Sequence, residues 1–81
     1  MNNLNEAVIQ RLYKYMEEKK ITQYKLARMS GVPFATVKSL LQRRTKGIQL
    51  KTVLMFAQGL DISPSEFFDD PLFSAECLLL E

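Results

Sequence analysis

The sequence predicts an all-α protein in which five helices enclose one core. Apolar residues recur at helical spacing along most of the chain, and capping residues stand at the expected helix ends. No segment shows the alternation of apolar and polar residues that is typical of a half-buried strand. The 81 residues suffice for one small domain, and the apolar fraction of 47% and charged fraction of 25% are ordinary for a globular protein.

Residues 4–20 are expected to form an amphipathic first helix. The residues of its apolar face are Val8, Ile9, Leu12, Tyr15 and Met16. A second helix is expected over residues 23–30, because Thr22 before it is a favourable N-cap and Gly31 after it is a favourable C-cap. The side chains of this second helix that are expected to face inward are Leu26, Ala27 and Tyr24.

A third helix is expected to open at Val32-Pro33, because proline in a first helical turn leaves no helical hydrogen bond unmade. Its buried stripe is expected to be Val37, Leu40 and Leu41. Residues 43–47 are expected to form a loop, and a fourth helix follows over residues 50–58 with Gly59 as its stop. The residues expected on the apolar face of this fourth helix are Leu50, Val53, Leu54 and Ala57.

Residues 63–66, with the sequence Ser-Pro-Ser-Glu, predict the start of a fifth helix. The serine and the glutamate have the spacing of a capping box, and proline stands at the first helical position. This short helix carries Phe67 and Phe68, and Asp70-Pro71 ends it. One or two further helical turns are expected within residues 74–81.

We divide the chain into a helical body, residues 1–68, and an acidic, apolar C-terminal tail, residues 69–81. The net charge is only +2, but all 11 Lys and Arg lie within residues 1–60, whereas residues 61–81 hold six acidic residues and no basic one. Residues 19–51 carry nine basic residues and no acidic one. This distribution favours a body that binds a polyanion such as nucleic acid, because Lys and Arg meeting phosphate supply the sequence-independent part of such binding. The alternative is a solvated basic surface.

The composition argues against an enzyme and against a metal or cofactor site. The chain has no His, which is the commonest acid–base catalyst and metal ligand, and it shows no paired acids on one face and no activated nucleophile. One Cys excludes a disulfide framework and a cysteine-based metal cluster. No apolar run approaches the roughly 20 residues of a membrane span, and no signal peptide opens the chain, so we expect a cytoplasmic protein without a membrane partner.

Residues 23–41 have the spacing of a helix-turn-helix. Ala27 stands where the two helices must approach closely, and Gly31 stands where the turn needs a positive φ. Val37 and Leu40 are placed to pack the second helix of the motif on the first. In such motifs the second helix enters the major groove of DNA. The alternative is a helical corner that only supports a bundle.

A wider set of positions carries a recognisable pattern, and it extends over about residues 8–68. These positions are Ile21-Thr22-Gln23, Leu26-Ala27, Ser30-Gly31-Val32, Thr36-Val37, Leu40, Leu50, Val53-Leu54, Ala57, Leu60, Ile62-Ser63 and Phe67-Phe68. The pattern resembles the lambda-repressor-like family of Cro/cI-type, or XRE-type, helix-turn-helix regulators. The resemblance implies a regulator of transcription that binds double-stranded DNA sequence-specifically, as a homodimeric repressor on a palindromic operator.

The resemblance also implies which residues contact DNA. The family's base contacts come from the outward side of the third helix, where this sequence has Pro33, Phe34, Ala35, Lys38, Ser39 and Gln42. Lys38 can donate to guanine and Gln42 can pair with adenine, whereas Phe34 and Ala35 offer only apolar contact with thymine methyls. For Phe34 the alternative is burial against the second helix or a dimer partner. Phosphate contacts are implied for Gln23, Thr36, Arg43, Arg44, Thr45 and Lys46.

Three departures from the family pattern concern the core and the loop. Met16 and Leu41 stand where many members have an Arg and a Glu that form a buried ion pair. Because both positions are apolar here, we expect them to pack together without a charge left unpaired. Arg43 stands where Gly is usual, and Gly47-Ile48 stands where Pro is usual, so the path of the loop is expected to differ.

The tail is too apolar to be a plain solvated segment, and three uses of it remain open. It can complete the core, dock another protein, or form a dimer seam with residues Phe67, Phe68, Leu72, Phe73 and Leu78. The second use corresponds to an alternative function, in which the protein is an antitoxin-like regulator or an interaction module whose tail holds a protein partner.

Overall fold

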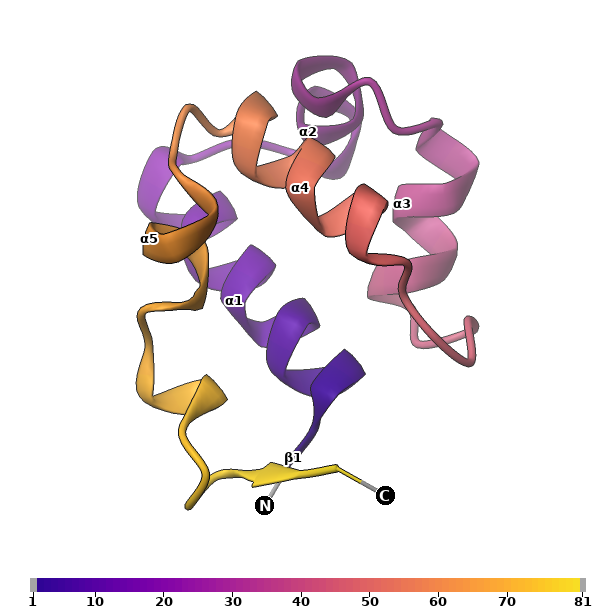
Figure 1. The fold of residues 1–81 in the computed structure, drawn as a ribbon. Coiled ribbons are helices and arrows are strands. Elements are labelled where there is room, and N and C mark those ends of the chain that lie inside the picture. Colours follow the sequence, from indigo (N-terminus) through magenta and orange to yellow (C-terminus); the bar gives the residue numbers. More distant parts are fainter. Residues whose placement is uncertain (1, 81) are drawn as a thin grey trace.

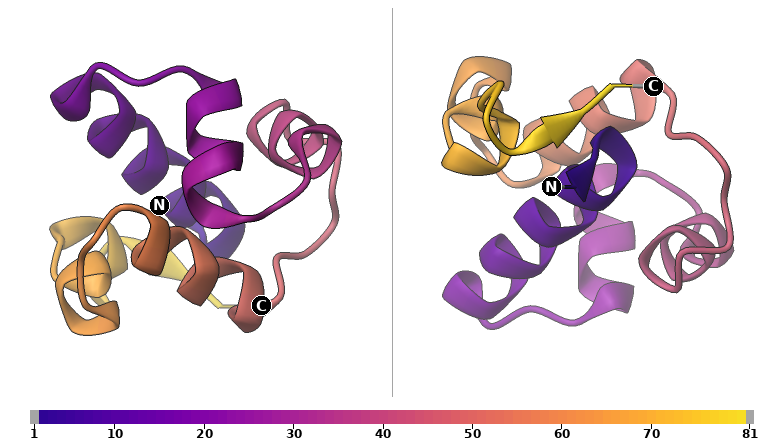
Figure 2. Two further views of the ribbon diagram at one scale, coloured as in Figure 1. Left: turned by 90° about the horizontal axis from the view of Figure 1, so that it is seen from above. Right: turned by 90° about the horizontal axis from the view of Figure 1, so that it is seen from below.

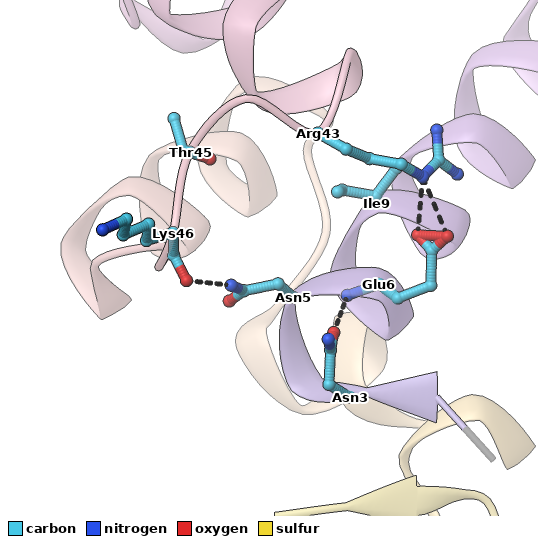
Figure 3. Close-up of a pocket in the computed structure, with 7 residues that line it drawn as sticks. All are labelled: Asn3, Asn5, Glu6, Ile9, Arg43, Thr45 and Lys46. Atoms are coloured by element: carbon cyan, nitrogen blue, oxygen red, sulfur yellow. Dashed lines mark hydrogen bonds and ion pairs between the residues drawn. The ribbon is translucent and has the colours of Figure 1, made fainter.

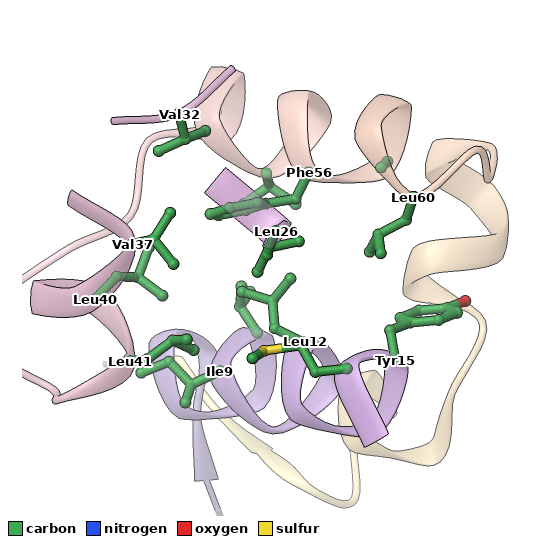
Figure 4. Close-up of a cluster of buried hydrophobic side chains, with 14 of the residues drawn as sticks. Ile9, Leu12, Tyr15, Leu26, Val32, Val37, Leu40, Leu41, Phe56 and Leu60 are labelled. Carbon is green, nitrogen blue, oxygen red and sulfur yellow. The ribbon is translucent and has the colours of Figure 1, made fainter. Parts of the chain in front are cut away.

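The computed structural model of the chain describes residues 2–80 (Figure 1). Its helices are α1 (Leu4–Lys19), α2 (Gln23–Ser30), α3 (Phe34–Leu41), α4 (Leu50–Gly59) and α5 (Pro64–Phe68). A 3-10 turn, η1 (Pro71–Phe73), and two short strands, β1 (Asn2–Asn3) and β2 (Leu78–Leu79), complete the described part. The core lies between α1 on one side and α4 on the other, with α3 and α5 at its two ends (Figure 4). The predicted all-α class with five helices is confirmed.

The starts of α2 and α5 follow from the predicted side-chain caps. The hydroxyl of Thr22 accepts a hydrogen bond from the backbone N–H of Lys25 at 3.1 Å, so it caps α2. The Ser63 hydroxyl accepts from the N–H of Glu66 at 3.1 Å and caps α5. Gly31 ends α2 with a left-handed φ of 77°, as expected for a C-cap glycine.

The core of the described residues contains no buried polar side chain. Its members are Ala7, Val8, Ile9, Leu12, Tyr15, Met16, Leu26, Ala27, Val32, Val37, Leu40, Leu41, Val53, Phe56, Ala57, Leu60 and Phe67. Met16 and Leu41 are both among them, which confirms that this pair of positions is apolar and packed. The predicted inward faces of α1 and α3 are also confirmed.

Two predictions of inward-facing residues were wrong. In α4, Leu50 is 64% exposed and Leu54 is only half-buried, whereas Phe56 is fully buried. The predicted apolar face and the face that contains Phe56 both satisfy helical spacing. The helix buries the face with Phe56, because its large ring removes more apolar surface from water. In α2, Tyr24 is 58% exposed, because a residue two positions before the buried Leu26 points to the other side of the helix.

Gly59 matters for a reason other than the predicted helix stop. A Cβ atom at this position would lie 2.6 Å from Cα of Ser30 and 2.7 Å from the carbonyl of Met29. Gly59 therefore lets the end of α4 pack directly on the backbone at the end of α2. The left-handed residue of this turn is Asp61, with φ of 59°.

The expected helical turns within residues 74–81 are reduced to a single turn, in which the N–H groups of Cys77 and Leu78 both donate to the carbonyl of Ser74 at 3.0 Å. The tail then forms a parallel ladder in which Leu78 and Leu79 face Asn2 and Asn3 of β1. A helix so short is marginal on its own, whereas pairing with β1 supplies the backbone with hydrogen-bond partners. The expectation of no strand was therefore wrong for these two residue pairs. Glu81, the last residue of the segment, lies outside the described residues.

Arg11 of α1 holds the end of α5 through several hydrogen bonds. Its Nε donates to the carbonyl of Phe67 at 2.8 Å, and Nη2 donates to the carbonyl of Glu66 at 2.8 Å. These carbonyls belong to the last turn of α5, where helical N–H partners run out, although the Glu66 carbonyl also accepts from the N–H of Asp69 at 3.2 Å. Nη2 also donates to the hydroxyl of Tyr15 at 2.8 Å, and Nη1 donates to the carboxylate of Asp70 at 3.0 Å.

The carboxylate of Asp70 is held in its charged form by this arrangement. Burial of the carboxyl raises its pKa, but the N–H of Leu72 and the cations of Lys14 and Arg11 outweigh that effect, so the pKa of Asp70 lies below its usual value. Lys14 Nζ donates to the same oxygen as Arg11, at 3.0 Å. Folding is thus linked to the ionisation of Asp70.

The pH dependence of stability tests this linkage. Because the pKa of Asp70 is lower in the folded than in the unfolded state, its contribution is complete above the unfolded value of about 3.8 and is lost as the pH falls through the folded value. We expect the free energy of unfolding in urea to fall more steeply below this pH in the natural protein than in Asp70→Asn. The exposed neighbour Asp69 supplies the control, and Asp69→Asn should keep the natural profile. Parallel profiles for the natural protein and Asp70→Asn would show that the carboxylate has no such role.

Candidate nucleic-acid interface

The helix-turn-helix lies at one end of the molecule. Figure 1 shows α3 on the side away from α5, and both views of Figure 2 show the same separation. The end of the tail lies closer to the loop after α3, because Lys46 lines one hollow together with Leu79 and Leu80. No helix among residues 2–80 is long and apolar enough to cross a membrane.

The outward side of α3 carries most of the residues predicted to contact bases. Val37, Leu40 and Leu41 are at most 2% exposed, which fixes the rotation of the helix. Of the residues predicted to contact bases, Phe34, Ala35, Lys38 and Gln42 then face outward and are exposed. At about 100° per residue these four lie within an arc of about 100°. Ser39 is half-buried at one side of this arc, and Pro33 is exposed just before the helix.

An aromatic pair stands at the start of this outward face. Phe34 is 43% exposed, and its ring lies edge-on to that of Tyr24, with 5.8 Å between ring centroids and 68° between ring planes. Phe34 therefore contacts α2 without being buried by it. Tyr24 was not predicted as a site residue, although its helical phase relative to Leu26 would have placed it outside.

The loop after α3 is fixed by two contacts with α1 (Figure 3). Nε of Arg43 donates to both carboxylate oxygens of Glu6, at 2.9 and 3.0 Å. The side-chain amide of Asn5 donates to the carbonyl of Lys46 at 2.6 Å. The seven residues in Figure 3 line an open hollow of about 410 Å³ between α1 and the loop. Asn5 and Glu6 were missed from the sequence, because a contact across about forty residues leaves no local pattern.

The departure from the family pattern at Arg43 strains the backbone. Its φ is 62°, a left-handed conformation that glycine adopts without strain. The hydrogen bond that Arg43 donates to the Glu6 carboxylate raises the pKa of the guanidinium and holds its charge in place. Among residues 2–80, Arg43 is the one basic residue of the segment 19–51 that forms an ion pair, so the positive charge of the others is not neutralised there.

The remaining residues predicted to contact phosphate are arranged in two places. Thr36 and Thr45 line a common groove between α3 and the start of α4, and both are exposed. Arg44 and Lys46 flank Thr45 in the loop and are also exposed. Gln23 is half-buried at the first position of α2 and does not line this groove.

The structure buries one of the five residues predicted for a dimer seam. Phe67 is fully buried, and its ring stacks against Tyr15 and meets the rings of Phe68 and Phe73. Phe68 and Phe73 pack against the core, and Leu72 and Leu78 are also half-buried. This part of the chain completes the core, so Phe67 offers no surface to a partner. The exposed large apolar residues near the tail are Leu4, Leu50, Leu79 and Leu80.

Comparison with known proteins agrees with this geometry. A family model described as the Cro/C1-type HTH DNA-binding domain matches residues 3–71, a range that contains all five helices. No curated protein and no solved structure gave a significant match. The match covers the helix-turn-helix, the exposed side of α3 and the basic loop after it. The chain therefore belongs to the Cro/C1-type family of DNA-binding regulators of transcription, the lambda-repressor-like, XRE-type helix-turn-helix proteins.

Proposed function

We propose that this protein represses transcription by binding a palindromic operator in double-stranded DNA as a homodimer. The observation that carries the proposal is the outward face of α3, which is exposed beside a basic loop while its other face is locked in the core. A helix presented in this way fits the major groove. Occupation of an operator is sufficient to exclude other proteins from the same DNA, so repression requires no further active group.

The proposal assigns two kinds of contact to the exposed residues. Lys38 donates to guanine, Gln42 pairs with adenine, and Ser39 adds a hydrogen bond from the side of the helix. Backbone phosphates are contacted by Gln23, Thr36, Arg44, Thr45 and Lys46. Arg43 belongs to the same loop, but its guanidinium is shared with Glu6 at 2.9 Å, so its contribution depends on that ion pair.

The salt dependence of binding to duplex DNA tests the phosphate contacts. Each contact releases about one counterion, and each variant removes one contact from both copies of the dimer. Arg44→Ala and Lys46→Ala should therefore weaken binding and each lower the magnitude of the slope of log K against log [salt] by about 2. Glu6→Gln should strengthen binding, because it releases the Arg43 guanidinium toward phosphate. Fluorescence anisotropy between about 50 and 200 mM salt gives both quantities.

The control for this experiment is Lys14→Ala, since Lys14 pairs with Asp70 on the far side of α1 from the loop. This variant should keep the natural slope. If Arg44→Ala and Lys46→Ala also keep the natural affinity and slope, the loop does not contact phosphate.

A surface for the second copy lies at the opposite part of the molecule from Phe34. Leu4 and Leu50 line one hollow, and Leu4 also lines a second hollow with Leu79, Leu80 and the polar residues Asn3, Asn5 and Lys46. Leu80 is 72% exposed and Leu50 is 64% exposed. An apolar surface of this kind indicates a binding site for protein. A second copy fits best, because a palindromic operator requires two copies related by a two-fold axis.

The oligomeric state tests this surface. Leu50→Asp should give a monomer in sedimentation equilibrium where the natural protein is a dimer, because a carboxylate would be buried in the seam. The fold should be kept, since an acidic residue at the first position of a helix is favourable. The control is Tyr13→Asp, which places the same charge at an exposed position of α1 outside this surface. This variant should remain dimeric.

A second candidate function shares the same surface. In an antitoxin-like regulator, Leu79 and Leu80 would hold a different protein, and their exposure at the end of the tail favours this candidate. A natural protein that is monomeric at all concentrations would contradict the homodimer and leave this candidate.

A further inference from the structure

We propose that Tyr24 and Phe34 form an aromatic surface that recognises the 5-methyl group of a pyrimidine, so that thymine is preferred at one position of each half-site. This inference rests on the proposed function and specifies what the start of α3 recognises. The chemistry of the recognised group is shared by thymine and 5-methylcytosine.

The two rings are held in a defined orientation while remaining open to an approaching molecule. Tyr24 is the second residue of α2 and Phe34 is the first residue of α3. Their edge-to-face contact, at 5.8 Å between centroids, is a preferred aromatic geometry. Because 58% of Tyr24 and 43% of Phe34 is exposed, each ring keeps apolar surface that a further contact can cover.

The rings border a shallow hollow whose other walls are small or apolar. Its lining residues are Tyr24, Ala27, Arg28, Gly31, Val32 and Phe34. Gly31 has no side chain and Ala27 has only a methyl group, so the floor of the hollow lies close to the backbone of the turn. Arg28 at the rim adds a positive charge that suits the adjacent phosphate of a bound strand.

The position of this hollow decides which chemical group it can meet. In a helix-turn-helix the first residues of the second helix lie closest to the base edges. The side chains of Phe34 and Ala35 there carry no hydrogen-bonding group, so they distinguish bases only by apolar contact. Among the four standard bases, thymine alone presents an apolar group, its 5-methyl, in the major groove.

The two aromatic residues have different tasks. Phe34 contacts the methyl group, because it stands on the outward arc of α3 with Lys38. Tyr24 is a positioning residue, because its ring sets the orientation of the Phe34 ring. The loss of either ring therefore removes the preference for the methyl group without changing the phosphate contacts.

The test uses a duplex enriched by the natural protein from a random-sequence pool. In both half-sites, one thymine at a time is replaced by uracil, which lacks only the methyl group. We expect one position at which binding weakens about fourfold per methyl, hence about fifteenfold for two half-sites. Cytosine placed at that position should bind more tightly when it is replaced by 5-methylcytosine.

The variants are compared by their ratio of thymine to uracil affinity at that position. Phe34→Ala and Tyr24→Ala should bring the ratio close to 1 and keep the natural salt slope, whereas Tyr24→Phe should keep the natural ratio because it retains the ring. Circular dichroism of each variant verifies its helical content.

Three results would overturn the inference. They are an equal affinity for thymine and uracil at every position, a natural ratio in Phe34→Ala, and a preference for thymine that 5-methylcytosine does not reproduce. In all three the proposed function stands, because an enriched duplex exists. Failure to enrich any duplex would overturn the inference and the proposed function together.

Discussion

The burial of Val37, Leu40 and Leu41 in the common core decides which side of α3 can meet another molecule. A helix of eight residues is not stable alone, so packing rather than helix propensity fixes its rotation. Once these three side chains are at most 2% exposed, Phe34 and Lys38 must face outward. The surface proposed to contact DNA is thus a consequence of the core, and substitutions among the buried residues would displace that surface without changing its own residues.

Helix α1 makes this arrangement rigid by holding the structure at both ends. Near its middle, Arg11 binds the last carbonyls of α5 and the carboxylate of Asp70. Near its start, Asn5 and Glu6 hold the loop after α3. The carboxylate of Asp70 is therefore paired with Arg11 and Lys14, and the basic loop is oriented by the start of the same helix. This pairing offsets the negative charge of Asp70, which would otherwise act to repel DNA.

Local chemistry was sufficient to predict most of the fold, whereas distant contacts were not predictable. Thr22 and Gly31 mark the ends of α2 because capping depends only on neighbouring residues. The apolar pattern of α4 allowed two inward faces, and only the packed core distinguishes the buried Phe56 from the exposed Leu50. The contacts of Arg11 join residues more than fifty positions apart, so no spacing in the sequence indicates them. The outward side of α3 was predictable from helical phase, but the restraint on its loop was not.

Selection from a random library of duplex DNA with the purified protein tests most directly whether α3 recognises a DNA sequence. A dimer that places two copies of α3 in successive major grooves should enrich a two-fold symmetric motif with half-sites about 10 base pairs apart. Binding that enriches no motif and is lost as salt rises would contradict sequence-specific recognition, because it would leave only a basic surface meeting phosphate.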